Sequence, residues 1–269
     1  MSQPKVSIIT PTYNSADTII ACLESVISQS YTNIEHLIID GLSTDHTLRI
    51  IKQYKLKYPH IKYLCEKDKG VYDAMNKGIS IAAGEWVFFL GSDDSLYSHD
   101  ILEKIFSNPN NLTLDVIYGN VLSSRFNGPY AGEYDALKLI DQNICHQAIF
   151  FKKSLFINTG VFNQAYIAHA DWAHNLKWFL NKKYKKKYVP HIISNYSDGG
   201  LSSSVKDEKF QEIKPLLILR YEHEQLSSQW KAHWAKHFAR ESLKHKKLIF
   251  FIEYVYFYLK NKCQILLNK

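Results

Sequence analysis

Cysteine is scarce in this chain of 269 residues, and its placement forms no recognisable motif. The four cysteines, Cys22, Cys65, Cys145 and Cys263, include no Cys-x-x-Cys pair and no cysteine–histidine set at the spacing of a zinc site. The sequence therefore indicates neither a structural zinc nor a redox-active motif. We expect the thiols to be reduced and the protein to be cytosolic.

Long apolar runs are also missing. The longest, at 248–259, has 12 residues and contains Glu253, whereas a membrane-spanning helix needs about 20 apolar residues. The N-terminal residues, MSQPKVSIITPTY, carry one lysine and no extended apolar core, so no secretory signal is predicted. The sequence thus predicts neither a spanning helix nor secretion by that route.

Charge is unevenly distributed along the chain. The whole sequence has 33 Lys+Arg and 26 Asp+Glu, a net charge of +7. Residues 1–176 contain 14 basic and 18 acidic side chains, which leaves 19 and 8 for residues 177–269, so the balance is −4 against +11. With 46% hydrophobic residues the chain can bury a substantial core. The basic character belongs to the C-terminal third.

The N-terminal half alternates strand and helix patterns. Short β-branched runs at 5–10, 36–40, 61–66 and 85–90 are separated by helical spacings over 17–28, 43–58 and 71–83. This rhythm predicts an α/β fold with a parallel sheet covered by helices. In such sheets ligands bind beyond the carboxyl ends of the strands.

Carboxylates follow three of the predicted strand ends, at Asp40, at Asp68 and at the pair Asp93–Asp94. Each one alone is equally well explained as a turn or helix-capping residue. Clustered like charges repel one another unless a cation or hydrogen-bond donors compensate them, so we expect one acidic rim. The adjacent pair suits a hard divalent cation, which takes one or two carboxylates and completes its shell with phosphate oxygens.

Taken in order, these segments resemble family-2 inverting glycosyltransferases with the GT-A fold. The similar segments are VSIITPTYNSADTIIACLESVISQSYTNIEHLIIDGLSTDHT at 6–47, EKDKGVYDAMNKGISIAAGEWVFFLGSDD at 66–94, CHQAIFFKKSLF at 145–156, HADW at 169–172 and GGLS at 199–202. The combination is more specific than any single piece, and it resembles the bacterial branch that builds capsule, exopolysaccharide or O-antigen repeat units.

The resemblance implies a Rossmann-like, mostly parallel central sheet flanked by helices, with a helical C-terminal extension. Residues 1–204 would form the catalytic domain, with a nucleotide-sugar half at about 1–97 and an acceptor half at about 98–204. Residues 205–269 would form the basic helical extension.

For the donor, the resemblance implies that Pro11, Tyr13 and Asp40 hold the nucleobase and ribose, with Asp68 bordering the same pocket. Tyr13 offers a ring face for stacking and Asp40 offers an acceptor, a combination that suits uridine. The alternative for Tyr13 is a partly buried core aromatic. Met75 stands where many relatives carry an arginine before Asn76, so Lys77 or a C-terminal lysine is expected to supply charge for the diphosphate.

For the chemistry, Asp93 and Asp94 match the family's DxD-type element, with Ser92 in its first place. Asp94 is then the expected ligand of a Mn²⁺ or Mg²⁺ ion, and Asp93 a ligand of the metal or of the ribose. Asp171 matches the catalytic base, which takes the proton of the acceptor hydroxyl, while the metal acts as a Lewis acid on the departing side. The alternative for Asp171 is a helix N-cap.

Three further residues are implied at the sugar or acceptor end of the site. His146 and Gln147 resemble a segment that borders the acceptor or donor sugar, and Trp172 is placed to stack on a sugar face. The alternatives are a structural histidine and a core tryptophan. The glycine-containing loop at 199–202 is expected to close over the diphosphate.

The basic C-terminal segment carries its own pattern. Residues 248–259, LIFFIEYVYFYL, include six aromatic side chains, with lysines on both sides at 244–247 and at Lys260 and Lys262. This layout is typical of a helix that lies in the headgroup layer of a membrane. We therefore expect a peripheral position at the inner face of the cytoplasmic membrane. The alternative is a helix that packs on the catalytic domain or forms a homodimer.

Three other classes of protein share some of these sequence features. A basic, aromatic segment also suits a nucleic-acid-binding module, but the acidic rim would repel a phosphodiester backbone. A nucleotidyltransferase lacks its Gly-rich basic loop here, and no GxGxxG follows the first strand, as a dehydrogenase requires. The sequence predicts a metal-dependent inverting glycosyltransferase that uses a nucleotide sugar, expected to be a UDP-sugar, and a lipid-linked or polysaccharide acceptor, without a nucleic acid partner.

Overall fold

A computed structural model describes residues 3–124, 128–130, 132–197, 205–221 and 223–267 of the chain. The elements of the N-terminal half are β1 (Val6–Thr12), α1 (Ile19–Ile27), β2 (Ile34–Asp40), α2 (Thr47–Lys57), β3 (Ile61–Cys65), α3 (Val71–Ile81), β4 (Trp86–Phe89), β5 (Ser95–Leu96), α4 (Ile101–Phe106) and the 3₁₀ helix η1 (Pro109–Thr113). Those of the second half are β6 (Val116–Ser123), β7 (Gly128–Tyr130), α5 (Ala136–Asp141), η3 (His146–Ala148), β8 (Ile149–Lys152), α6 (Ser154–Thr159), α7 (Ala170–Phe179) and β9 (Lys186–Asn195). Three helices follow, α8 (Glu208–Arg220), α9 (Ser228–Lys244) and α10 (Leu248–Leu267).

The described strands form one sheet in the order β3-β2-β1-β4-β8-β6-β9-β5, and β7 pairs with β6. Strands β3, β2, β1 and β4 are parallel, so their carboxyl ends lie at one edge. Beyond β4, antiparallel pairs join β8 to β4 and to β6, and β6 is parallel to β9. The predicted α/β fold with a mostly parallel central sheet is confirmed, and β1 runs past Pro11 to Thr12.

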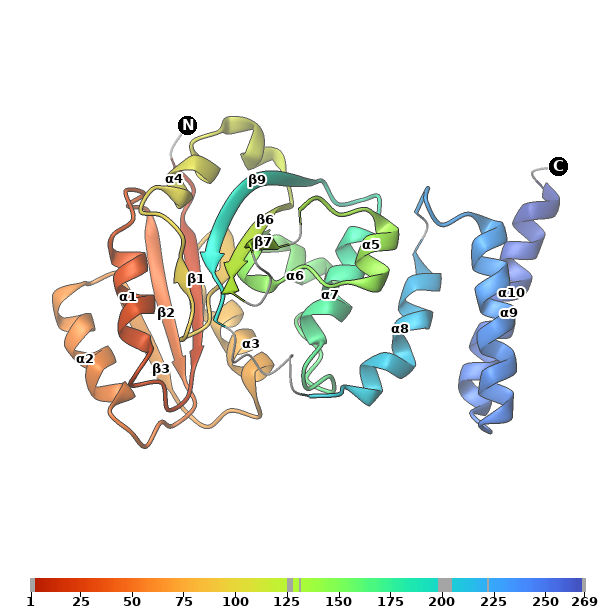
Figure 1. Cartoon of the computed structure of the whole chain (residues 1–269), viewed down its shortest axis with the longest axis horizontal. Helices are drawn as coiled ribbons and strands as arrows, with labels where there is room; N and C mark the ends of the chain where they lie inside the picture. The colour runs from red at the N-terminus through yellow and green to blue at the C-terminus, as the bar shows by residue number, and fades with distance from the viewer. Residues whose placement is uncertain (1–2, 125–127, 131, 198–204, 222, 268–269) are drawn as a thin grey trace.

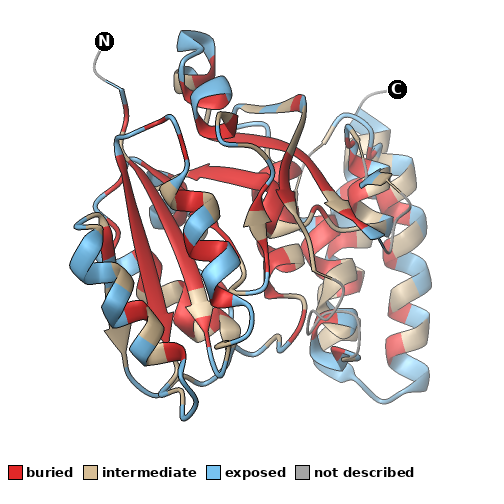
Figure 2. Ribbon diagram, turned by 60° about the vertical axis from the view of Figure 1, so that its left-hand side comes forward, coloured by how far each residue is buried: buried red, intermediate tan, exposed pale blue. Residues whose placement is uncertain are grey.

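The central strands carry apolar residues on both faces because both faces of the sheet are covered. Successive side chains of a strand point to opposite faces, so Ile9 joins a core cluster with α3, α6 and α7, whereas Ile8 joins a second cluster with α1 and α4. Figure 1 shows the helices on either side of the sheet, and Figure 2 shows the strands buried along most of their length.

Helix α8 connects the part of the chain that contains the sheet to the C-terminal helices α9 and α10. Its Phe210 and Leu217 belong to the cluster around α7, while Leu216 and Leu219 pack with side chains of α9 and α10 in a third, smaller cluster. The helical C-terminus is as predicted. The predicted domain boundary at residue 204 remains a prediction, and α8, which follows it, contributes to both clusters.

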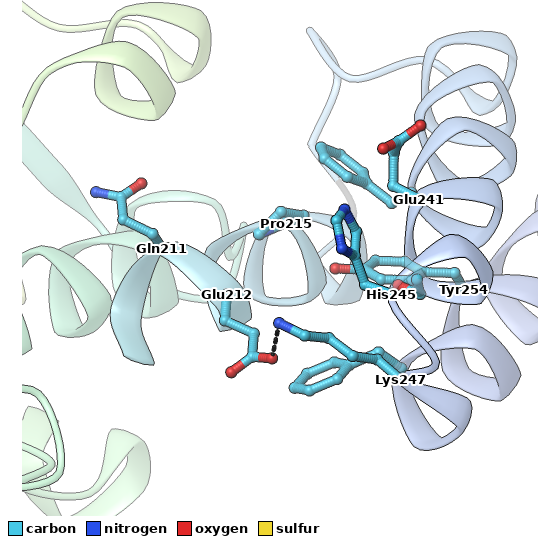
Figure 3. A pocket seen from close by; sticks show the side chains of 10 residues that line it. Gln211, Glu212, Pro215, Glu241, His245, Lys247 and Tyr254 are labelled. Atoms are coloured by element: carbon cyan, nitrogen blue, oxygen red, sulfur yellow. Dashed lines mark ion pairs between the residues drawn. The ribbon is translucent and has the colours of Figure 1, made fainter. Parts of the chain in front are cut away.

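Helices α9 and α10 pack along each other as a hairpin (Figure 1). Tyr254 of α10 stacks on Phe238 of α9 with ring centroids 5.5 Å apart. An ion pair of 2.5 Å between Glu212 and Lys247 ties the hairpin to α8, and Figure 3 shows it at the small cavity of about 170 Å³ between the three helices. Among the described residues, no helix combines the length and apolarity that a membrane span requires.

The packing of α3 against β1 generates a stability prediction at Gly78. A Cβ added there would overlap the buried side chain of Ile9, which a central strand holds in place. We expect Gly78→Ala to lower the free energy of unfolding by about 1–3 kcal/mol, the range for overpacking a core, measured by urea denaturation. Ser80→Ala, at an exposed position of the same helix, is the control and is expected to change stability by less than about 0.5 kcal/mol. Equal stability of the two variants would contradict this account of the helix–strand contact.

Candidate active site

A cavity of about 880 Å³ opens at the carboxyl ends of β1 and β4, and the second half of the chain forms its other wall. Both its position at a strand-end edge and its size are typical of ligand sites in α/β proteins. Eight of the residues predicted from the sequence line it: Pro11, Tyr13, Asp93, Asp94, His146, Gln147, Asp171 and Trp172.

Tyr13 presents its ring to this cavity. Its side chain is 62% exposed, so it is not a core aromatic. The loop that carries it is braced, since the side chain of Asn14 accepts a hydrogen bond from the backbone N–H of Thr44, and Ser43 Oγ accepts one from the N–H of Asn14. Asn14 has a φ of 49°, a conformation that costs a non-glycine residue energy and recurs at functional loops. The bracing holds a stacking platform at the rim.

Asp40 and Asp68 lie behind this rim rather than in the cavity wall. Asp40 is fully buried, and its carboxylate accepts hydrogen bonds from the N–H and Oγ of Ser43 and from Cys65 Sγ. Asp68 lies beside Gly41, where an added Cβ would come within 2.9 Å of its Oδ2 and 3.5 Å of Tyr13 Cδ2. Their roles in nucleotide binding remain predictions, and the structure gives Asp40 a loop-bracing role as well.

Lys77 is surrounded by carboxylates. Its Nζ lies 2.5 Å from Asp68, 3.0 Å from Glu66 and 3.6 Å from Asp73. Burial alone would lower the pKa of Lys77, but hydrogen bonds to Asp68 and Glu66 raise it above its usual value. Because three anions already compensate this ammonium, the geometry does not favour its predicted role as the diphosphate cation. It fixes the loop that follows β3.

The pair Asp93–Asp94 occupies a tight turn after β4. A Cβ at Gly91 would come within 2.8 Å of Asp93 Oδ1 and 2.5 Å of Asp94 Oδ2, so the two carboxylates converge above this glycine. Asp94 is buried and accepts hydrogen bonds from Gln147 Nε2 at 2.9 Å and from the N–H of Ser197 at 2.8 Å. Burial and the neighbouring charge of Asp93 raise the pKa of Asp94 above its usual value.

Two converging carboxylates whose charges repel each other are a donor set that suits Mg²⁺ or Mn²⁺. Among the described residues, no group of three or more His, Cys, Asp or Glu side chains is arranged as a closed metal cage. A closed cage is not needed, because Mg²⁺ in substrate-phosphate sites is bound through one or two carboxylates together with the phosphates and water. The residues present therefore fit a substrate-assisted divalent ion.

Asp171 lies in the first turn of α7 and is held by four hydrogen bonds. Its carboxylate accepts from Tyr72 OH at 2.9 Å, Asn143 Nδ2 at 3.0 Å and the N–H of Trp172 at 2.8 Å, and His146 Nδ1 lies 3.3 Å from its Oδ2. The helix begins at Ala170 after an N-cap position at His169, so the N-cap alternative for Asp171 is wrong.

The same contacts determine the charge of Asp171. Burial would raise its pKa, but the hydrogen bond and charge of His146 and the hydrogen bonds from Tyr72 and Trp172 outweigh burial, so the pKa lies below its usual value. The N-terminal end of a helix also favours an anion. Asp171 is therefore an ionised carboxylate in the wall of the cavity, able to accept a proton.

A chain of hydrogen bonds through Asn175 orients the side-chain amide of Asn143, one of the donors to Asp171. Trp178 Nε1 donates to Asn175 Oδ1 at 3.0 Å, and Asn175 Nδ2 donates to Asn143 Oδ1 at 2.9 Å. This leaves Asn143 Nδ2 facing Asp171. Tyr72, Asn143 and Asn175 are not among the residues predicted from the sequence. Tyr72 lies within a segment that carried the family resemblance and Asn175 lies one helical turn after Asp171, but no short-range signal indicates that Tyr72 and Asn143 donate to Asp171.

The turn η3 joins the two acidic centres. His146 contacts Asp171 and its neighbour Gln147 donates to Asp94, so successive residues reach opposite sides of the cavity. Ser194 of β9 in turn donates to the backbone oxygen of Gln147 at 2.7 Å. The predicted role of these residues in binding a sugar remains a prediction, and their observed contacts position the two aspartates.

Trp172 is half-buried between the cavity and α8. Its Nε1 donates to the backbone oxygen of Leu139 at 2.8 Å, and its ring packs on Phe210 and beneath the ammonium of Lys214, 3.7 Å from the ring centroid. Burial lowers the pKa of Lys214 to about 8.

Asp207, the N-cap of α8, accepts hydrogen bonds from the N–H groups of Ala168 and His169, immediately before α7. Helix α8 thus supports the turn that carries Asp171. The loop at 199–202, expected to close over a diphosphate, lies outside the described residues.

The fold and the acidic cavity place the protein among the glycosyltransferases of GT-A architecture. The chain belongs to glycosyl transferase family 2, whose sequence model matches residues 7–162. This result decides for the enzyme class over the nucleic-acid-binding module and the nucleotidyltransferase that the sequence left as alternatives.

Relatives and solved structures agree with this assignment. The PGL/p-HBAD biosynthesis glycosyltransferase of Mycobacterium tuberculosis is 37% identical over 221 residues, 80% of this chain and 86% of that protein. The chondroitin synthase of Escherichia coli is 29% identical over 218 residues, 78% of this chain and 31% of the synthase. A structure of TarS from S. aureus in complex with UDP-GlcNAc has a TM-score of 0.68 at 20% identity, over 88% of this chain and 72% of that chain. The mannosyltransferase PcManGT of Pyrobaculum calidifontis, in complex with GDP-Man and Mn²⁺, has a TM-score of 0.58 at 17% identity, over 100% and 89%.

The hydrogen bonds around Asp171 predict a pH effect. In Asn143→Ala, loss of one donor to the carboxylate raises the pKa of Asp171. A base must be deprotonated, so activity is lost as the pH falls through this pKa, and the acidic limb of the pH–rate profile for glycosyl transfer moves to higher pH. We also expect kcat to fall about tenfold, since a hydrogen bond to a charged group contributes roughly 1.5 kcal/mol. Gln142→Ala, in the same cavity wall, should leave the limb in place, and an unmoved limb in Asn143→Ala would contradict the assignment.

Proposed function

We propose that this protein is an inverting glycosyltransferase that moves a sugar from a UDP-sugar to a lipid-linked or polysaccharide acceptor in bacterial surface glycan synthesis. One observation carries the proposal: an ionised Asp171 and the pair Asp93–Asp94 face one cavity, and the single turn η3 holds both. Such a pairing suits a displacement in which one side accepts a proton and the other side bears a leaving anion.

The reaction is a single displacement at the anomeric carbon. The acceptor oxygen forms the new bond to that carbon while the bond to the diphosphate oxygen of the donor breaks, which inverts the configuration. The acceptor hydroxyl gives its proton to the carboxylate of Asp171. The four hydrogen bonds to Asp171 keep it ionised and oriented before the acceptor arrives, so little reorganisation is needed during the reaction.

The donor site is proposed at the β1 and β4 edge. The exposed ring of Tyr13 beside Pro11 offers the uracil a stacking surface. The TarS structures, similar in fold, were solved with UDP and with UDP-GlcNAc, which supports a UDP-sugar over the GDP-Man of the Pyrobaculum calidifontis mannosyltransferase. The relatives named for PGL/p-HBAD biosynthesis and as a chondroitin synthase support a glycan or glycolipid acceptor.

Asp94, with Asp93, would hold the divalent ion. The ion supplies positive charge to the leaving diphosphate, which Lys77 is poorly placed to do because three carboxylates already compensate it. The two aspartates reach the cavity only because Gly91 lacks a side chain.

The base assignment is tested with Asp171→Asn. The amide keeps the shape of the side chain but cannot accept the proton, so we expect transfer to fall about 10²- to 10⁴-fold with UDP affinity unchanged. Transfer is scored as acceptor-dependent UDP release over a panel of UDP-sugars, and UDP affinity by calorimetry. Asp141→Asn, a second carboxylate that lines the cavity, is the matched control and should stay active. Transfer by the Asp171→Asn protein at the wild-type rate would refute the assignment of Asp171 as the base.

The metal assignment is tested by the binding of UDP to Asp94→Ala. For the wild type we expect Mn²⁺ or Mg²⁺ to tighten UDP binding relative to EDTA, since an ion held by Asp94 and Asp93 would offset the negative charge of the diphosphate. In the variant this gain disappears while the affinity in EDTA stays the same. Asp17→Ala, which removes another acid from the cavity wall, should retain the gain. A wild-type protein that binds UDP equally well in EDTA and in metal would argue against a metal-bound donor.

A further inference from the structure

Helix α10 has two apolar faces, and only one of them is covered. Tyr254, Phe257 and Asn261 are buried toward α9. On the outer side, large apolar residues recur at intervals of three and four: Ile249, Ile252, Tyr256, Leu259 and Leu266, with the exposed Cys263 completing the spacing. We call these six residues the outer stripe. Its five large members are each 55% to 74% exposed.

The outer stripe extends over the 18 residues from Ile249 to Leu266, or about 26 Å of helix. A contiguous apolar surface of this kind is rare on a monomeric soluble protein and marks an interaction site. The helix needs no such surface for its own packing, because its inner face already joins the small cluster with α8 and α9.

The charges around the outer stripe are positive. Lys260 and Lys262 are exposed on its two sides, and Lys244 and Lys246 are exposed at its N-terminal end. Glu253 is the one acid in α10, and it pairs with Arg220 of α8 at 3.7 Å. An apolar helix face bordered by lysines suits an anionic lipid surface, where apolar side chains enter the acyl boundary and ammonium groups meet phosphates.

The same charges argue against a second copy of this chain as the partner. In a two-stranded coiled coil, the residues that flank such a stripe face their counterparts on the other helix. In an antiparallel pair with the stripes fully overlapped, Lys260 would lie nearest to Glu253 of the other copy, but Glu253 already pairs with Arg220 of its own chain. In a parallel pair, Lys260 would face Val255 and Lys262 would face Leu267. Neither arrangement therefore offers these lysines an acidic side chain that lacks a basic partner.

We propose that the outer stripe of α10 binds an anionic phospholipid surface, with the helix lying in the headgroup layer at the inner face of the cytoplasmic membrane. This deepens the proposed function, because a lipid-linked acceptor would be presented at the same surface. Helix α8 makes the connection, since it packs on the hairpin through Leu216 and Leu219 and supports the turn of Asp171 through Asp207.

The test is co-flotation of the full chain with vesicles of phosphatidylcholine alone or with about 30% phosphatidylglycerol. We expect binding to the anionic vesicles only, weakened by salt. The double variant Ile252→Ser/Leu259→Ser should bind at least about tenfold more weakly, since it removes two apolar anchors, and Lys260→Glu/Lys262→Glu should lose the preference for anionic lipid. The control Leu56→Ser/Ile157→Ser changes two exposed apolar residues far along the chain, on α2 and α6, and should bind like the wild type.

Equal flotation of the wild type and the stripe variant, or equal binding to neutral and anionic vesicles, would overturn the proposal. So would light scattering that shows a dimer which the stripe variant dissociates, because a second copy would then cover the stripe. Matching circular dichroism melting curves would verify that the variants fold. The vesicle assay needs no donor or acceptor, so it tests the two proposals separately. A protein that does not bind vesicles but still releases UDP would refute only the lipid-binding proposal. A protein that binds vesicles but releases no UDP would refute only the proposed function.

Discussion

The active site depends on one short turn that ties together two carboxylate centres from distant parts of the chain. In η3, His146 contacts Asp171 and Gln147 donates to Asp94, while Ser194 of β9 fixes the backbone between them. The lengths of these hydrogen bonds set how far apart the two acids can lie. The pKa directions follow from the same contacts. Burial and Asp93 raise the pKa of Asp94, whereas hydrogen bonds keep that of Asp171 low despite its burial. One carboxylate therefore favours a compensating cation and the other remains ready to accept a proton.

A second constraint lies behind the site. Asp207 caps α8 and accepts from the two backbone N–H groups that precede α7, while Phe210 packs on Trp172. The opposite side of α8 packs on the α9–α10 hairpin. The same helix thus contacts both the turn that carries Asp171 and the helix with the proposed lipid-binding stripe, so the C-terminal helices are structurally continuous with the part of the chain that forms the cavity.

Much of the fold could be predicted because its signals are local. Strands β1 and β2 carry apolar residues that point to both faces of the sheet, as strands covered on both faces require, and the strand–helix rhythm predicts their parallel order. Site residues next to strand ends, such as Tyr13 and Asp94, could be predicted for the same reason. Lys77 shows the limit, because only its i,i+4 pair with Asp73 has a local pattern, whereas Glu66 and Asp68 reach it from the loop before α3.

The sequence by itself determined the family, the parallel half of the sheet and the acidic edge, since each rests on residues close together in the chain. Tertiary structure decided the rest. Tyr72 and Asn143 reach Asp171 across 99 and 28 residues, and Asn175 acts only through Asn143. It also decided which side of α10 is buried, because the aromatic run 248–259 is apolar around most of the helix and only packing on α9 separates an inner face from an outer one. Hydrogen bonds and packing between distant segments have no local pattern in a sequence, so the fold had to assemble them before their roles could be inferred.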